Sequence, residues 1–293
     1  TMHLAAALKT KIIGLFFAHA HPFETAPFTA GNLIFQARIS CAPCSYGVDC
    51  NNIICVDKVK PNHILSFIDN YECHNTWKLP FDLKDCQDLN IYETVFSAHN
   101  LVRLKPMIKH EISINDIFRL AYSVLWRETL DQEINTDCDA MQELLEEFSH
   151  SNSAMILESL DDKMTILEDI ESLSLNGIML CEKIIKVVSE SKSMTSKLAK
   201  LGEDIFKVDE KIELVGMSNP ELKLLTDMFN KRKENQNGND INHLGMECIN
   251  YYKLLKKESI RLMEILSVHK EIILKISKNY NAHNSIKVCV PGR

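Results

Sequence analysis

Residues 113–125 read SINDIFRLAYSVL, and this stretch begins the part of the chain that decides the fold. Ser113 or Asn115 can cap a helix, and Asp116 follows in the first turn, where a negative charge suits the helix dipole. Apolar residues then recur at three- and four-residue spacing and form one stripe: Ile117, Leu120, Ala121, Val124 and Leu125. The stretch therefore predicts the first helix of a region in which helices bury apolar stripes.

Prolines and charges divide the chain just before this stretch. Six of the eight prolines lie in the first 106 residues, and only Pro220 lies between 107 and 290. Proline breaks helix interiors, so helices are favoured after residue 107. Residues 1–110 carry a net charge of +1 and residues 111–293 a net charge of −8. The sequence thus predicts an α+β protein: a small, β-containing N-terminal head with a cysteine cluster (1–110), then a long helical bundle or coiled-coil region (111–293).

Short apolar runs in the head predict strands. β-Branched and aromatic residues dominate the runs at 12–17, 33–39, 53–56 and 91–96. The run at 63–68 is too short to distinguish a strand from a helical turn. Residues 45–52 and 85–90 read as loops, as do the surroundings of Pro61 and Pro80.

Further apolar periodicity predicts the remaining helices. A second helix is expected from about residue 139, with an interruption at Asn176-Gly177, and a third periodic stretch covers 178–212. Gly216 and then Ser218-Asn219-Pro220 indicate a stop and a restart, with proline at the first position of a short helix. Residues 234–240 read as a loop, and a long last helix covers about 241–280.

Charge along the helical region suggests how the helices pair. Residues 116–171 contain 15 acidic and 3 basic residues, whereas 178–233 and 234–293 are both net positive. Two interpretations stay open: the acidic segment folds back on basic helices of the same chain, or it meets a basic partner subunit. Doublets such as Ile184-Ile185 and Ile272-Ile273 widen the apolar stripe. A wide stripe favours a three- or four-helix bundle, or a heteromeric coiled assembly, over a two-stranded rod.

Cysteines are concentrated in the head. Six of the ten lie between residues 41 and 86: Cys41, Cys44, Cys50, Cys55, Cys73 and Cys86. Cys41-x2-Cys44 has the spacing of half a zinc site, but the following pair, Cys50-x4-Cys55, is looser than zinc sites usually are. Free thiols, disulfides and zinc ligation all stay open, so the metal content is left undecided. The other four cysteines, Cys138, Cys181, Cys248 and Cys289, are scattered singly, which suits a reducing compartment.

The N-terminal residues 2–20 resemble a secretory signal, because two lysines precede an apolar run and a small-x-small sequence. The apolar run is short for a signal and serves equally as a strand. None of the 22 asparagines begins an Asn-x-Ser/Thr glycosylation site. These observations favour an intracellular protein of the cytoplasm or nucleus.

No sequence motif supplies a catalytic constellation. His19-Ala20-His21 could place two imidazoles on one metal, but the chain lacks the alternating strand–helix pattern on which such hydrolase sites are built, and a polar strand end is the simpler interpretation. Nucleophile-elbow, phosphate-loop and dinucleotide-binding glycine patterns are absent from the sequence. Lys231-Arg232-Lys233 reads as the solvated end of a helix, and Trp77 and Trp126 read as core residues. We therefore expect no catalytic residues and no cofactor.

The sequence favours a non-enzymatic structural or interaction subunit of a larger intracellular protein assembly. Its β-rich head and amphipathic helices would bind protein partners, in a hetero-oligomer formed through the helical stripes. The net charge of −7 argues against nucleic-acid binding, and neither a transmembrane segment nor a small-molecule substrate is inferred. The alternative is a secreted, disulfide-stapled helical protein with membrane- or receptor-directed activity.

Overall fold

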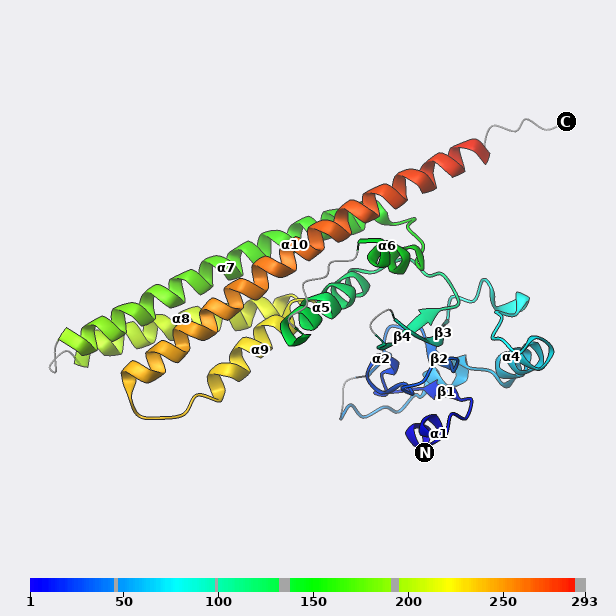
Figure 1. Cartoon of the computed structure of the whole chain (residues 1–293), viewed down its shortest axis with the longest axis horizontal. Helices are drawn as coiled ribbons and strands as arrows, with labels where there is room; N and C mark the ends of the chain where they lie inside the picture. Colours follow the sequence, from blue (N-terminus) through cyan, green and yellow to red (C-terminus); the bar gives the residue numbers. More distant parts are fainter. Residues whose placement is uncertain (45–46, 98–99, 132–137, 191–194, 288–293) are drawn as a thin grey trace. The chain divides into compact units, whose positions relative to one another are not determined.

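The computed structural model describes residues 1–44, 47–97, 100–131, 138–190 and 195–287 (Figure 1). The chain forms two compact units, Thr1–His110 and Glu111–Arg293. The first unit contains a four-stranded sheet with short helices, and the second is helical throughout its described elements. The predicted α+β class, with a small β-containing head followed by a long helical region, is therefore confirmed.

The sheet of the first unit has the order β1-β2-β3-β4. Its strands are β1 (Ile13–Phe16), β2 (Leu33–Ala37), β3 (Leu89–Phe96) and β4 (Val102–Pro106). β1 runs parallel to β2, and the other two pairs are antiparallel. The strands predicted at 12–17, 33–39 and 91–96 are confirmed, and the apolar run of the signal-like segment 2–20 contains β1. The sequence did not predict β4, which ends in a proline at the edge of the sheet, where a missing donor is tolerated.

Helices and turns surround the sheet. They are α1 (Met2–Ala7), α2 (Pro22–Thr25), α3 (Ile54–Lys58), α4 (Pro61–His74) and the 3-10 turn η1 (Phe81–Leu83). Leu33, Phe35 and Ile91 form one core with Phe67 of α4, whose ring meets that of Phe35 edge-on at a centroid distance of 5.6 Å. The ambiguous run at 63–68 is therefore helical, and Pro61 starts α4.

The strand predicted at 53–56 is wrong, because these residues belong to α3 and its first flanking position. Within this run only Cys55 is buried, while Ile53, Ile54 and Val56 are exposed. A four-residue apolar run does not define its own period, and here a single inward position satisfies one turn of helix.

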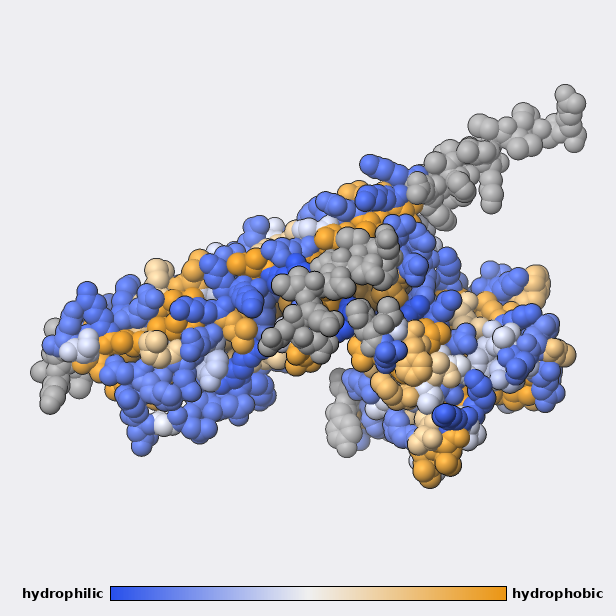
Figure 2. All heavy atoms as spheres, in the orientation of Figure 1, coloured by the Kyte–Doolittle hydropathy of each residue, from blue (hydrophilic) through white to orange (hydrophobic). Residues whose placement is uncertain are grey.

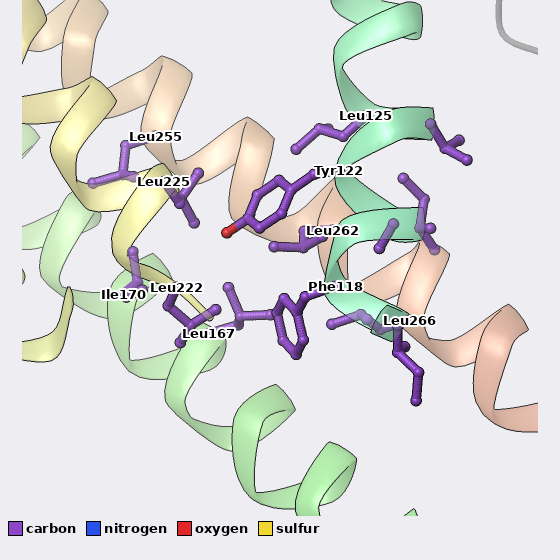
Figure 3. Close-up of a cluster of buried hydrophobic side chains, with 14 of the residues drawn as sticks. Phe118, Tyr122, Leu125, Leu167, Ile170, Leu222, Leu225, Leu255, Leu262 and Leu266 are labelled. Carbon is purple, nitrogen blue, oxygen red and sulfur yellow. The ribbon is translucent and has the colours of Figure 1, made fainter. Parts of the chain in front are cut away.

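The second unit is a bundle of long and short helices. They are α5 (Ile114–Asp131), α6 (Cys138–Glu146), α7 (Ser153–Glu190), α8 (Thr195–Ser218), α9 (Lys223–Glu234) and α10 (Ile241–Lys287). α7 and α10 lie side by side along much of their length (Figure 1). Side chains of α5, α7, α9 and α10 point toward one another in a common core (Figure 3). Helix-bundle packing, as the wide stripes predict, is therefore what the structure shows.

The predicted cap at the start of α5 is made by Ser113. Its Oγ accepts a hydrogen bond from the backbone N–H of Asp116 at 3.2 Å, and the Asp116 carboxylate accepts one from the Ser113 backbone at 3.1 Å. These reciprocal bonds satisfy two donors at a helix end that no intrahelical carbonyl can reach.

Ion pairs join the acidic segment to α10. Glu171 of α7 pairs with Lys256 at 3.2 Å, and Asp161 of α7 pairs with Lys270. Glu128 of α5 accepts two hydrogen bonds from Arg261, at 2.6 and 2.7 Å. The acidic segment therefore folds back on a basic helix of the same chain, which is the first of the two interpretations of the charge pattern.

The helix boundaries differ from prediction near 150 and near 177. A single helix was expected from 139 to 176, but α6 ends at Glu146 and α7 begins at Ser153. Polar side chains hold the break between them: Ser153 donates to the His150 carbonyl, and Asn152 donates to the Ile112 carbonyl. The interruption expected at Asn176-Gly177 is wrong, because α7 continues through it. The stretch expected at 178–212 includes 191–194, which lie outside the described residues.

Gly177 and Gly216 permit close packing and do not end helices. A Cβ at Gly177 would lie 2.6 Å from Cε2 of Tyr252 and closer still to its Cζ. A Cβ at Gly216, within α8, would overlap Oγ1 of Thr226 on α9. The restart after α8 begins at Lys223, so Pro220 lies in the turn and not at the first helical position. The loop predicted before α10 is confirmed, since α9 ends at Glu234 and α10 begins at Ile241.

Gly177→Ala is expected to lower the free energy of unfolding by about 2 kcal/mol, because the buried Tyr252 ring must move to admit a methyl group. Gly202→Ala is the matched control, since a methyl group at Gly202 of α8 would meet nothing within 4 Å. That change is expected to add up to about 1 kcal/mol through helix propensity. Urea denaturation followed by circular dichroism measures both, and equal effects of the two substitutions would contradict the packing role of Gly177.

Candidate functional site

The head cysteines are free thiols in the structure. Cys41, Cys50 and Cys73 are exposed, Cys44 and Cys86 are half-buried, and Cys55 is buried. The Cys44 thiol donates to the Cys41 carbonyl at 3.2 Å, and the Cys50 thiol donates to the Asn52 carbonyl at 3.3 Å. Among the described residues, no three His, Cys, Asp or Glu side chains are grouped so that they could hold a metal ion. Cys289 lies outside the described residues.

The His19-Ala20-His21 segment has a local structural role. Nδ1 of His21 accepts a hydrogen bond from the backbone N–H of Phe23 at 3.3 Å and thereby caps α2. The His21 ring also meets the Phe23 ring at a centroid distance of 5.5 Å. Because β1 ends at Phe16, the segment lies in the turn between the strand and α2 and does not itself end the strand.

The basic run 231–233 is not a solvated helix end, which corrects the interpretation from sequence. Lys231 is exposed and pairs with Glu234, but Arg232 and Lys233 turn inward. Arg232 makes a two-pronged pair with Glu258 of α10, with both N–O distances at 2.8 Å. Lys233 pairs with Asp209 of α8. The run therefore ties α9 to two neighbouring helices.

A polar cluster lies inside the bundle around Lys233. It consists of five residues from four helices: Cys181 of α7, Asp209 of α8, Lys233 of α9, and Cys248 and Tyr252 of α10. The Tyr252 hydroxyl donates to Asp209 at 2.6 Å, and the Lys233 ammonium lies 5.0 Å from the centre of the Tyr252 ring. Burial, reinforced by Asp209, raises the pKa of Tyr252. Asp209 is thus held by a tyrosine and an ammonium at once.

The two cysteines of this polar cluster influence each other's pKa. Cys181 is 1% exposed and Cys248 is 7% exposed. The hydrogen bond between the two side chains raises the pKa of Cys181, with burial acting in the same direction. That bond lowers the pKa of Cys248 against the effect of burial, and the Lys233 ammonium contributes through its charge and a hydrogen bond. The pKa values of the two cysteines are therefore shifted in opposite directions, upward for Cys181 and downward for Cys248.

This polar cluster could not be predicted from the sequence, because its members lie up to 71 positions apart. The one local signal is small residues beside each cysteine on the same helix face. Gly177 precedes Cys181 by four residues, and Gly245 precedes Cys248 by three. Such spacing indicates two helices that approach closely at a thiol, but it does not identify the partner helix.

A groove of about 560 Å³ runs between α7 and α8. Its apolar lining combines half-buried core residues with one exposed side chain: Ile166, Leu173, Val215 and Leu214. Leu214 is 52% exposed. Asp169 of α7 and Lys211 of α8 also line it, so the groove combines apolar surface with charges of both signs.

A second groove, of about 730 Å³, lies between α5 and α10. Its lining is mostly charged, and Glu128, Glu258 and Arg261 among its residues are already engaged in ion pairs within the chain. The α7–α8 groove is therefore the better candidate for an apolar partner.

Among the helices of the described residues, none combines the length and the apolar character needed to cross a bilayer. Comparisons with protein-family models, with curated proteins and with solved structures each gave no match to this chain.

Proposed function

We propose that this chain is a non-enzymatic interaction subunit of a larger intracellular protein assembly, and that its helical unit binds an amphipathic helix of a partner protein. The observation that carries the proposal is the α7–α8 groove, in which the half-exposed Leu214 stands beside a partly buried apolar lining. Free thiols at all eight cysteines whose side chains the structure describes suit the reducing interior of a cell.

The shape and chemistry of the groove favour a helix as its occupant. A channel between two helices accepts the apolar stripe of a third, with residues at i, i+3, i+4 and i+7 as anchors. Ile166 and Leu173 lie seven positions apart on α7, so the apolar lining extends over two turns. Asp169 and Lys211 can pair with the polar flanks of such a helix and fix its direction. Hydrophobic residues also form a band along the long helices (Figure 2).

The head offers additional apolar surface. Phe28 and Phe96 are both exposed, and their rings meet edge-on at a centroid distance of 6.2 Å. Aromatic residues are enriched at the centres of protein interfaces, so this pair supports a docking role for the head as well.

Leu214→Glu is expected to reduce partner binding at least about tenfold, because it removes an apolar anchor and places a charge in the groove. Leu274→Glu is the matched control: Leu274 is a partly exposed leucine of α10 that does not line the groove. The measurement is quantitative co-purification of the full chain from its native cells, together with photo-crosslinking from position 218, which also lines the groove, in the wild type and in both variants.

The proposal requires crosslinks from position 218 to a helical segment of a reproducible partner, and their loss in Leu214→Glu but not in Leu274→Glu. Equal recovery of partners with all three proteins would refute the groove as the binding site. A native chain that runs as a lone monomer in size-exclusion chromatography with light scattering would refute the subunit role itself.

A further inference from the structure

We propose that Cys181 and Cys248 form a dithiol modification site, at which a small hydroperoxide such as hydrogen peroxide links α7 to α10 through a disulfide. The site lies within the bundle and does not involve the α7–α8 groove residues Leu214 and Leu173. It is a covalent function that the proposed interaction role neither requires nor implies.

The register of α7 against α10 sets the two thiols opposite each other. Gly177 of α7 faces Tyr252 of α10, and Ile185 of α7 faces Gly245 of α10. Residue numbers therefore rise along α7 while they fall along the facing part of α10, so the two helices are antiparallel. Cys181 and Cys248 lie midway between these two contacts and continue the same register. The sequence separation of each cysteine from its glycine is one helical turn.

Close approach of the helices makes a disulfide geometrically reasonable. A disulfide needs Cα atoms about 4.4–6.8 Å apart, whereas packed helix axes usually lie about 8–10 Å apart. Facing side chains bridge that difference only where the helices are close. A Cβ at Gly245 would come within 2.8 Å of Ile185, and one at Gly177 would overlap Tyr252, so both glycines mark a tight contact on either side of the thiols.

A fixed cation stands beside the thiol pair. The Lys233 ammonium interacts electrostatically with Cys248 and is anchored by Asp209, which the Tyr252 hydroxyl holds from the other side. A cation beside a cysteine favours its thiolate, which is the reactive form. Because Cys181 and Cys248 are almost fully buried, a small oxidant such as hydrogen peroxide can reach them more easily than a bulky disulfide reagent that would oxidise them by thiol exchange.

The chemistry proceeds in two balanced steps. The Cys248 thiolate attacks one oxygen of hydrogen peroxide, the O–O bond breaks, and a sulfenic acid forms while hydroxide leaves and takes up a proton to become water. The sulfur of Cys181 then attacks the sulfenic sulfur, gives up its proton and expels a second water. Two thiols are oxidised, one peroxide is reduced to two waters, and one S–S bond is made.

The test treats the full chain with hydrogen peroxide, blocks remaining thiols under acid quench and maps the peptides by mass spectrometry. The expected result is a peptide linked through Cys181 and Cys248, which appears before oxidation of the exposed Cys41, Cys50 and Cys73. In Cys181→Ser, Cys248 is expected to accumulate as a sulfenic acid, which dimedone traps when it is present as the oxidised chain is unfolded. Oxidation of the exposed head cysteines with the bundle pair still reduced would overturn the proposal.

Lys233→Met tests the role of the cation, with Lys231→Met as the matched control on the exposed side of the same helix, α9. The first change is expected to slow formation of the link at least about tenfold, and the second to leave it unchanged. Should Lys233→Met not fold, as judged by circular dichroism, Lys233→Arg keeps the charge and is expected to retain the link. Oxidation of Lys233→Met at the wild-type rate would overturn the assigned role of Lys233.

Discussion

Arg232→Met is expected to lower the free energy of unfolding by about 4 kcal/mol, the largest effect anticipated for a single substitution in this chain. The reason is the environment of its partner. Glu258 is 2% exposed, and Arg232 donates to both of its carboxylate oxygens at 2.8 Å. Methionine preserves the apolar stem but leaves a buried carboxylate without its cation, and removing a charge from water without compensation is costly.

Two further variants separate this cause from a general loss of packing. Lys231→Met changes the exposed neighbour of Arg232 and is expected to alter the free energy of unfolding by less than about 0.5 kcal/mol. The double variant Arg232→Met/Glu258→Leu removes both charges and is expected to recover most of the loss, because an apolar replacement of a buried pair is often neutral. Chemical denaturation of these variants, with Glu258→Leu alone and the wild type, completes a double-mutant cycle. A double variant as unstable as Arg232→Met would contradict the assignment to an unpaired carboxylate.

The sequence could have predicted that the side chains of Arg232 and Lys233 point into the bundle. The apolar stripe of α9 includes Leu225 and Phe229, and the next positions at the same helical spacing are 232 and 233. Long basic side chains can extend an apolar stripe with their stems while their charged heads reach a partner. What the sequence could not supply is the identity of those partners, Glu258 and Asp209, because they belong to helices that meet α9 only in the folded bundle.

Local sequence patterns predicted the elements that have a clear alternation of apolar residues or a clear capping residue. Three strands and the cap of α5 fall in this class, since alternation and side-chain capping are properties of adjacent residues. Predictions failed where a residue serves a distant neighbour. Gly177 was interpreted as a helix break, but its missing side chain makes room for Tyr252 of α10. Glycine permits both outcomes, and only tertiary packing distinguishes them.

The polar cluster shows the same limit at the level of the site. Each of Cys181, Cys248 and Lys233 has an ordinary sequence context, and their contact arises from the register of three helices. The head cysteines are near one another in sequence, yet the described residues form no metal-ligand group there. Nearness of cysteines along the chain therefore indicated a polar site less well than the faces on which residues of different helices lie.

Acidification is expected to destabilise the helical unit through His269 of α10. This side chain is 0% exposed, and neither ring nitrogen makes a well-aligned hydrogen bond to the described residues. Burial lowers the pKa of His269 to about 4, and the nearby Ile265 carbonyl opposes that effect only in part. The imidazole is therefore neutral in the folded chain at pH values where an exposed histidine, with a pKa of about 6.5, would begin to bind a proton.

The sign of the effect follows from proton binding in the two states. Between pH 6.5 and 4 the unfolded chain protonates His269 while the folded chain does not, so the free energy of unfolding falls as the pH falls, by a total of about 3 kcal/mol. Above pH 6.5 His269 is neutral in both states, so the stabilisation is fully present. Below about pH 4 the whole of the roughly 3 kcal/mol has been lost. Other groups titrate in the same window, so the measurement is the difference between wild type and His269→Leu in urea denaturation at pH 7.5, 6, 5 and 4. The variant should lose less stability than the wild type at each step down in pH. Parallel pH profiles for the two proteins would show that His269 does not titrate on unfolding as its burial requires.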